Sequence, residues 1–427
     1  MIVRLRRDAT LEDGALVEGH VRMPLGKLGP GVAAAVELLR EGADEDALDD
    51  AAGESELMAL QLLLRRLETR GWLEREAPGL ATLVPIGHEI QPVLASPPEL
   101  ALSRFAYVRE DAGQLVVETP RASVRVLLHT PEAVQTVFAL PKGDPVTSLL
   151  VRAGIAVAPE DEQRRELEQW SFADLLFHAR SRVGRNLGGY GGSFHLEGRY
   201  EPLPARREPF EPATALPAPT GSDAFFDLLE SRVSIRQHDD ERPITRDQLA
   251  EFLWRVARVR GVWFDGHEEV VSKPYPAGGA LHELELYPLV TNCHELAPGL
   301  YHYDAHAHAL GLVSEPTPAT TLLVEYARRT AVMDTPPQVA ILIAARFGRM
   351  MWKYESMAYA AVLKHVGVLY QTMYLVATAL GLAPCALGGG NSDAFAAAAG
   401  TDYYAESTVG EFVLGSLPET ITPISAT

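Results

Sequence analysis

Hydrophobic residues recur at two different periods along the chain, and each period predicts a different kind of element. Helical spacing marks "PGVAAAVELLREGA" and, more strongly, "ESELMALQLLLRRLETRGWLERE" near the N-terminus. We expect Gly71 to close the second helix, and a strand, a Pro-Gly turn and another strand to follow it. Helices followed by a small hairpin indicate a winged-helix-like domain over residues 1–96.

A second domain of the same kind is predicted over residues 97–185. Apolar residues alternate with period two in "RFAYVREDAGQLVVETPRASVRVLL", with a turn at Asp111–Gly113. Helical spacing follows, and "LLVRAGIAVAP" repeats the helix, glycine and strand order of "LETRGWLERE". The front part of the chain is therefore predicted to be a tandem pair of winged-helix-like domains.

Residues 186–221 are rich in Gly and Pro, which predicts a linker without long regular elements. Residues 222–427 then predict a domain of mixed helices and strands. We expect amphipathic helices in "DAFFDLLESR" and "TRDQLAEFLWRVARVRG", the second capped by Thr245. Strands are expected in "LELYPLVTN", "QVAILIAARF" and "TVGEFVLGSLPE".

One apolar stretch, residues 366–387, is about long enough to cross a membrane. No basic cluster marks one of its ends, and small or polar residues interrupt it: Gly367, Gln371, Thr372, Gly381 and Pro384. We therefore predict a helix that protein covers on all faces, in part at a subunit interface, rather than a membrane span.

Composition and charge exclude several classes of function. The chain has 427 residues, 47% of them hydrophobic and 22% charged, which is typical of a globular protein. The formal net charge of −19 argues against a general nucleic-acid or anionic-membrane binder, although local arginines can still hold an anionic cofactor. No secretory signal is visible at the N-terminus, so we expect a cytoplasmic protein.

Cysteine and histidine spacing gives no sign of a metal site. Cys293 and Cys385 form neither a disulfide framework nor a metal-ligand pattern. Five histidines lie between His282 and His308, but their spacing matches no zinc signature, so we expect solvated side chains and no metal.

Three segments carry candidate binding chemistry. In "SRVSIRQHD", residues Arg232, Ser234 and Arg236 share one face if the segment is extended, and two guanidiniums around a hydroxyl suit a phosphate. In "KPYPAGGALHELELY", paired glycines let the backbone approach a flat ring closely. In "LGLAPCALGGG", the terminal glycines offer amides to an anion. In isolation, a solvated strand face explains the first pattern equally well, and a plain tight turn is the alternative for the second.

The aromatic cluster around Lys353 is a candidate for acid–base chemistry. An amine buried among Met351, Trp352 and Tyr354 would lose solvation, and its pKa would fall toward values useful for a base. The alternative is a surface lysine whose stem lies over aromatic rings.

Taken together, these segments resemble the flavin-dependent nitroreductase-like superfamily, and within it the SagB-type peptide azoline dehydrogenases. The matching motifs are "SRVSIR", "YPAGGALHELELY", "PGLYHYDAHAHALGLV", "GVLYQTMYLVATALGLAPCALGGG" and, upstream, "WSFADLLFHARSRVGRN". Two departures are visible. Ala277 stands where the family more often has Ser, and "VLGSLPETITPISAT" lacks the basic residue that the superfamily often supplies near the C-terminus.

The resemblance implies an α+β fold: a nitroreductase-like FMN-binding domain over residues 222–427, with a mixed sheet flanked by helices, forming a homodimer around the flavin. Lys353 and Tyr354 would be the catalytic pair that accepts a Cα proton while FMN accepts a hydride. The residues that would hold FMN are Arg232, Ser234, Arg236, Pro276, Ala277, Gly278, Gly279, Gln371, Leu387, Gly388 and Gly389.

The implied function is oxidation of thiazoline or oxazoline rings in a ribosomally made precursor peptide, after a separate cyclodehydratase, with O2 restoring the flavin. The winged-helix-like domains would bind the precursor or dock partner enzymes. Two other functions stay open: an NAD(P)H-dependent nitro- or quinone reductase, and a non-catalytic flavin-fold scaffold that binds a precursor.

Overall fold

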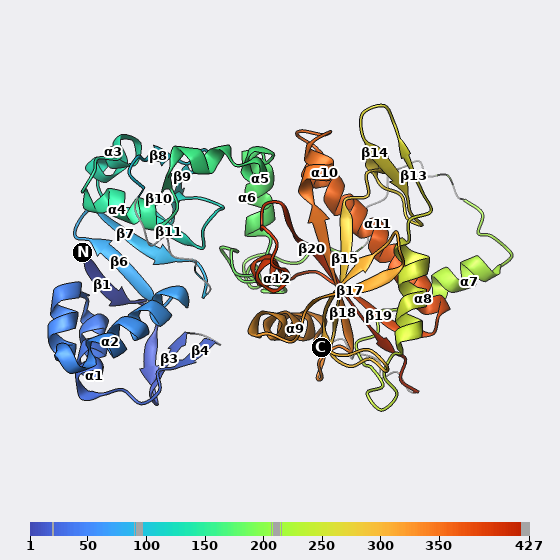
Figure 1. Cartoon of the computed structure of the whole chain (residues 1–427), viewed down its shortest axis with the longest axis horizontal. Coiled ribbons are helices and arrows are strands. Elements are labelled where there is room, and N and C mark those ends of the chain that lie inside the picture. Colours follow the sequence, from blue (N-terminus) through green and yellow to red (C-terminus); the bar gives the residue numbers. More distant parts are fainter. Residues whose placement is uncertain are drawn as a thin grey trace. The chain divides into compact units, whose positions relative to one another are not determined.

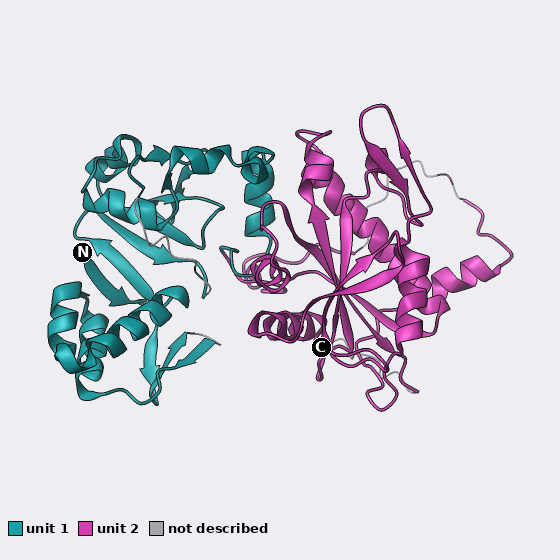
Figure 2. Cartoon of the chain, viewed as in Figure 1, with its two compact units in different colours: residues 1–187 teal, residues 188–427 magenta. Residues whose placement is uncertain are grey.

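The computed structural model describes residues 1–18, 21–88, 90, 97–205, 207, 214 and 216–419. It divides the chain into unit 1, Met1–Leu187, and unit 2, Gly188–Thr427 (Figures 1 and 2). The predicted domain boundary at residue 96, part of the predicted linker and the C-terminal residues 420–427 lie outside the described residues. The described residues of the linker contain no helix or strand, as predicted.

Unit 1 is built on one antiparallel sheet of seven strands. In spatial order they are β5 (Ala43–Asp44), β1 (Ile2–Leu5), β6 (Leu73–Ala77), β7 (Ala81–Pro85), β11 (Val124–Leu128), β10 (Gln114–Glu118) and β9 (Tyr107–Asp111). The predicted hairpin after Gly71 (φ 64°) is β6–β7, and the predicted turn after Asp111 joins β9 to β10. Because β7 pairs with β11, the two predicted domains share this sheet.

Two hydrophobic cores flank the shared sheet. Helices α1 (Pro30–Glu41) and α2 (Glu45–Thr69) build the first core around Leu39, Leu60 and Trp72. Helices α3 (Pro131–Ala139) and α4 (Pro145–Arg152) contribute to the second. The winged-helix assignment of each half stays a prediction. The remaining elements are β2 (Thr10–Glu12), β3 (Ala15–Glu18), β4 (Val21–Pro24), β8 (Ala101–Leu102), β12 (Ala156–Val157), η1 (Pro159–Gln163), α5 (Arg165–Glu168) and α6 (Phe172–Arg180).

Unit 2 has a central sheet of six strands. In spatial order they are β17 (Ala309–Ser314), β16 (Gly299–Asp304), β15 (Leu284–Val290), β18 (Val339–Arg346), β20 (Glu406–Ser416) and β19 (Leu382–Leu387). The three predicted strands are confirmed as β15, β18 and β20. Every ladder is antiparallel, so the prediction of a mixed sheet was wrong. The reason is that hairpins join β15, β16 and β17, while β20 runs opposite to both of its neighbours.

Helices cover both faces of this sheet (Figure 1). Helices α9 (Pro318–Ala331) and α12 (Ser392–Ala399) lie on one face, and α8 (Arg246–Ala257) and α11 (Ala358–Ala379) lie on the other. Phe412 of β20 stacks on Phe252 of α8 at 6.3 Å between ring centroids, whereas the next residue, Val413, belongs to the core beneath α9 and α12. The smaller elements are α7 (Ala224–Ser231), β13 (Gly261–Phe264), β14 (Glu269–Ser272), η2 (Gly278–Ala280) and α10 (Phe347–Met351).

The long apolar stretch forms α11 and β19. Within the described ranges, no helix has the combination of length and apolar character that a membrane crossing needs. Gly367, Val368 and Gln371 of α11 are exposed in the single chain. The prediction that protein covers this helix on all faces is therefore not met within one copy, because the sheet covers only one side of it.

We expect the cap of α8 to contribute measurably to stability. Thr245 Oγ1 accepts the Gln248 amide at 3.1 Å, and Gln248 Oε1 accepts the Thr245 amide at 3.0 Å. Thr245→Ala removes one of these bonds and should lower the free energy of unfolding by about 1 kcal/mol in urea titrations. Thr245→Ser keeps the hydroxyl and should match the wild type. Equal stability of the alanine and serine variants would contradict this role of the cap.

Candidate functional site

The segment with the two predicted phosphate-binding arginines runs in extended form beside β19. The Ile235 amide donates to the Pro384 carbonyl at 2.8 Å and turns the Ile235 side chain into the core. Arg232, Ser234 and Arg236 are half-buried, as the predicted alternation requires. A hydroxyl between two guanidiniums is a donor set that suits a phosphate group.

Tyr374 of α11 joins this segment to β19. Its hydroxyl lies 2.7 Å from Ser234 Oγ and accepts the Ala386 amide at 2.8 Å. The Arg232 guanidinium lies 5.2 Å from the centroid of the Tyr374 ring. Burial raises the pKa of the neighbouring Cys385 thiol, and the charge of Arg236 opposes that rise. One tyrosine therefore aligns Arg232 and Ser234 with the end of β19.

The glycine loop after β19 is fixed by close packing rather than by unusual backbone angles. Tyr370 of α11 donates to the Leu387 carbonyl at 3.2 Å and accepts the Glu411 amide at 2.8 Å. A Cβ atom at Gly389 would collide with the phenol of Tyr190, whereas one at Gly388 would meet nothing within 4 Å. Gly388 is thus the open position of this loop.

The turn at Pro276–Gly279 meets the predicted catalytic pair. Gly279 adopts φ 63°, and a Cβ atom there would lie 2.9 Å from Tyr354 Oη and 3.4 Å from Lys353 Nζ. The Gly278 amide donates to His365 Nε2 at 2.7 Å. The fold therefore brings the glycine turn, Lys353 and Tyr354 together, although about 75 residues separate them in sequence.

Lys353 is not the desolvated amine that the sequence predicted. Its side chain is 28% exposed, and Nζ lies 3.2 Å from both Asp265 Oδ2 and Glu268 Oε1 in the loop between β13 and β14. Hydrogen bonds to Asp265 and then Glu268 raise the pKa of Lys353 instead of lowering it. The neighbouring Trp352 is itself 62% exposed, so the aromatic cluster does not enclose the amine.

Gln371 stands apart from these contacts. It lies on the exposed side of α11 with Gly367 and Val368, and its side chain makes no hydrogen bond within the described part of the chain.

Three functional candidates were missed from the sequence: His365, Tyr370 and Tyr374. Their signal was available, since each carries a polar atom to the buried side of a mostly apolar helix. Polar atoms in such a position usually have a specific partner.

The histidines between His282 and His308 are not all solvated, which corrects the prediction. His282 is buried against Tyr275, with 5.0 Å between ring centroids, and burial lowers the pKa of His282 to about 4. His302 lies 3.3 Å from Glu285, and His308 lies 2.9 Å from the Tyr303 hydroxyl. Among the described residues, no three His, Cys, Asp or Glu side chains are arranged to hold a metal ion.

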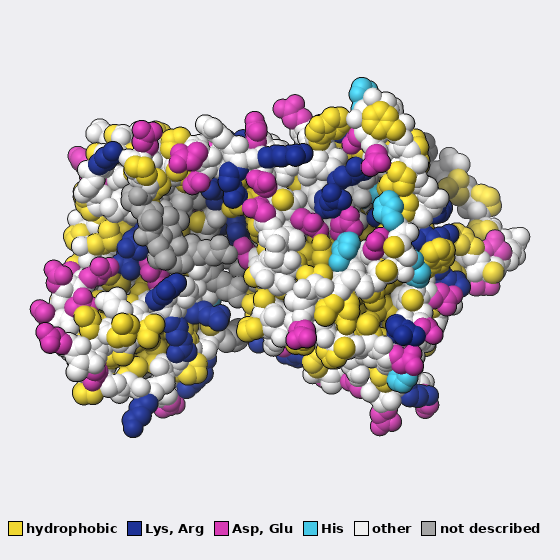
Figure 3. Space-filling view, viewed as in Figure 1, with side chains coloured by type: hydrophobic (Ala, Val, Ile, Leu, Met, Phe, Trp, Pro, Cys, Tyr) yellow, Lys and Arg dark blue, Asp and Glu magenta, His cyan; other side chains and the backbone are white. Residues whose placement is uncertain are grey.

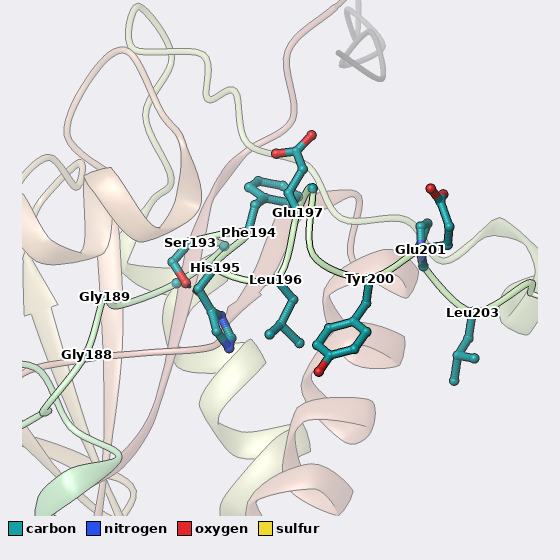
Figure 4. A pocket seen from close by; sticks show the side chains of 14 residues that line it. Gly188, Gly189, Ser193, Phe194, His195, Leu196, Glu197, Tyr200, Glu201 and Leu203 are labelled. Carbon is teal, nitrogen blue, oxygen red and sulfur yellow. Dashed lines mark hydrogen bonds between the residues drawn. The ribbon is translucent and has the colours of Figure 1, made fainter. Parts of the chain in front are cut away.

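A large hollow of about 1460 Å³ lies along residues 188–203 and is lined by that one segment (Figure 4). His195, Leu196 and Tyr200 extend from the same side of it (Figure 4). The hollow contains none of the predicted site residues, although Tyr190 from the same segment contacts Gly389.

Two family models match separate parts of the chain. Residues 229–416 match the model of the nitroreductase family, and residues 100–157 and 143–187 match the model of the cyanobactin oxidase ThcOx. A nitroreductase-like protein of Methanocaldococcus jannaschii is 26% identical over 162 residues, which are 38% of this chain and 77% of the relative.

Solved structures resemble the chain only weakly. The E. coli microcin synthetase McbBCD complex with truncated pro-MccB17 bound has 20% identity and a TM-score of 0.43, covering 60% of this chain and 97% of that chain. A Bacteroides fragilis nitroreductase with bound FMN has 13% identity and a TM-score of 0.29, covering 48% and 95%.

The buried His282 predicts a loss of stability in acid. With a folded-state pKa of about 4 and an unfolded value of about 6.5, the unfolded state binds more protons between these limits. Stability should therefore fall as the pH drops from about 6.5 to 4, by up to about 3 kcal/mol from this group. When the denaturant midpoint is plotted against pH over this range, the slope should be shallower for His282→Gln than for the wild type. An equal slope in the two proteins would contradict the account.

Proposed function

Because residues 229–416 match the model of the nitroreductase family and residues 100–187 match that of a cyanobactin oxidase, we propose that the chain is an FMN-dependent peptide azoline dehydrogenase. It oxidises thiazoline or oxazoline rings of a ribosomally made peptide to thiazoles or oxazoles. The family matches support the coarser statement: an oxidoreductase with a flavin, of the kind that oxidises heterocycles in such peptides. The observation that carries the finer proposal is the meeting of an amine and a phenol, Lys353 and Tyr354, at the Gly279 turn.

The residues present suit a phosphorylated planar cofactor. Arg232, Ser234 and Arg236 form a donor set for the phosphate of FMN. Gly278 and Gly279 have no side chains, and a Cβ atom on either would press on His365 or Tyr354. Gly388 faces open space. The ring of FMN would lie along Pro276, Ala277, Gly278 and Gly279, with Gln371, Leu387, Gly388 and Gly389 completing the site.

The protein's own part in the reaction is to accept the Cα proton. When bound, FMN supplies the two-electron oxidation, with O2 as the final acceptor. Lys353 holds its own proton between Asp265 and Glu268, so the amine must separate from these carboxylates before it can act as a base. Tyr354 shares the space above Gly279 with the Lys353 amine. We assign proton transfer to this pair.

Uncovered apolar side chains support a homodimer. Phe225 and Phe226 of α7 are 61% and 43% exposed, and Val368 of α11 is 37% exposed. A second copy of the chain is the occupant we propose for these surfaces, because an exposed apolar patch of this kind is typical of an interface.

We further propose that unit 1 binds the precursor peptide. The bound precursor would also bring this protein into contact with a cyclodehydratase. A groove of about 250 Å³ lies beside β4, an edge strand, and its lining includes Leu25, Leu62 and Leu63 with Lys27 and Arg66. Lys and Arg side chains gather over the region of β3 and β4 (Figure 3). In a chain with net charge −19, a basic rim on an apolar groove suits an extended segment with apolar and acidic residues.

Lys353→Ala should keep the fold and the bound flavin but lower azole formation by about a hundredfold or more, since it removes an acid–base group. Mass spectrometry of the peptide and the flavin absorbance of the purified protein measure both properties. Lys353→Arg is the matched control, because it keeps a cation beside Asp265 and Glu268 yet cannot act as a base. Activity retained by the arginine variant would assign Lys353 a purely electrostatic role.

Arg236→Ala should weaken FMN binding by about tenfold or more, because a charge-assisted hydrogen bond is lost. Titration of apoprotein with FMN, followed by flavin fluorescence, gives the dissociation constant. Arg242→Ala serves as the control, since that arginine pairs with Asp239 and Glu419 instead. Equal FMN affinity in the two variants would remove Arg236 from the phosphate site.

Leu62→Glu should raise KM for full-length precursor by about tenfold, equal to roughly 1.4 kcal/mol, and leave KM for a short azoline peptide unchanged. Leu62 lines the groove and is 63% exposed. Met58→Glu on the same helix is the control, because Met58 is 74% exposed and outside the groove lining. If both variants bind precursor equally well, the groove is not its binding site.

A further inference from the structure

The turn that meets Lys353 and Tyr354 has a costly backbone conformation. Gly279, Ala280 and His282 adopt φ values of 63°, 55° and 47°. Only glycine adopts this left-handed region freely, and each other residue costs about 1–2 kcal/mol there. Such a turn persists only when surrounding groups hold it.

His365 is one of the groups that hold it. The side chain of His365 is 9% exposed on the buried side of α11, and its Nε2 accepts the Gly278 amide at 2.7 Å. Because an accepting nitrogen carries no proton, the ring proton must be on Nδ1. Nδ1 lies 2.8 Å from Glu283 Oε1 and donates to it. The hydrogen bonds thus run from the turn through His365 to Glu283.

Glu283 is anchored to the sheet. It is fully buried, and its backbone carbonyl accepts the Arg346 amide of β18 at 3.0 Å. Lys273, which is 6% exposed, is a nearby buried cation whose charge interacts with that of Glu283. Within the described residues, Glu283 Oε2 has no hydrogen-bond partner. A buried carboxylate with an unpaired oxygen contributes little to the stability of a fold, so its presence beside the turn points to a role at the site.

The turn lies between this pair and the catalytic candidates. Gly278 meets His365, while the next residue, Gly279, meets Tyr354 and Lys353. A shift of the turn would therefore move Gly279, which contacts the side chains of Tyr354 and Lys353. Misplacement of a catalytic group by about 1 Å can lower a rate by about a hundredfold.

We propose that His365 and Glu283 are positioning residues that fix the Gly278–Gly279 turn relative to the flavin and to Lys353 and Tyr354. This inference rests on the proposed function, since it takes the turn as part of the flavin site. Neither side chain touches the substrate in this role. The pair acts by presenting one hydrogen-bond acceptor, Nε2, at a fixed place.

The test compares His365→Leu with His365→Gln in the full-length, FMN-loaded protein. Leucine removes the acceptor, whereas glutamine retains one. For His365→Leu we expect a shifted visible spectrum and midpoint potential of the bound flavin, and a kcat lower by about a hundredfold with little change in KM. His365→Gln should have a flavin spectrum, midpoint potential and kcat between those of His365→Leu and the wild type. The control is His302→Leu, which breaks the pair that His302 of β16 makes with Glu285 of β15 and should leave the flavin spectrum unchanged.

A flavin spectrum, potential and kcat of wild-type value in His365→Leu would overturn the proposal, as would equal effects of His302→Leu. If His365→Leu does not fold, Glu283→Leu, which removes the partner of Nδ1, is judged by the same readouts. The two hypotheses fail differently. A wild-type protein that binds FMN but oxidises no azoline refutes the proposed function, whereas the flavin spectra of the variants still decide whether the pair positions the turn.

Discussion

The candidate site depends on one constraint: α11 holds three distant segments of the chain through three side chains. His365 accepts the Gly278 amide, Tyr370 holds the Leu387 carbonyl, and Tyr374 binds both Ser234 and the Ala386 amide. Nine residues separate the first of these side chains from the last, which corresponds to about 13 Å along a helix. Because the sheet packs against the buried side of α11, the spacing between the glycine turn and the arginine segment is set by the helix itself.

A second feature shapes the chemistry that we propose. The Lys353 amine reaches the turn from outside α11 and pairs with two carboxylates of the β13–β14 loop. The pKa of Asp265 is lowered to about 2, first by the backbone amides of Glu268 and His267 and then by Lys353. The resting arrangement thus favours a protonated lysine. If Lys353 acts as the base, its amine must leave Asp265 and Glu268 of the β13–β14 loop when substrate binds. Substrate binding would then control whether the amine is available as a base.

Local features of the fold could be predicted from the sequence, and contacts between distant segments could not. The cap at Thr245, the helix end at Gly71 and the alternation around Ser234 follow from local rules, and all three are confirmed. The environment of Lys353 was predicted wrongly because its partners lie in a hairpin 85 or more residues earlier, at Asp265 and Glu268. The bond between His365 and Gly278 is equally non-local, so an apolar helix pattern gave only the hint that its polar atoms need partners.

The central claim is that the flavin of this protein is reduced by an azoline ring. Anaerobic mixing of the FMN-loaded protein with a synthetic azoline peptide, followed at the flavin absorbance band and by peptide mass, tests it most directly. We predict bleaching of the flavin and a mass loss of about 2 Da per ring, with no bleaching by NADPH. Bleaching by NADPH together with an unreactive azoline peptide would contradict the claim and identify a reductase, and a protein that binds no FMN would identify a scaffold.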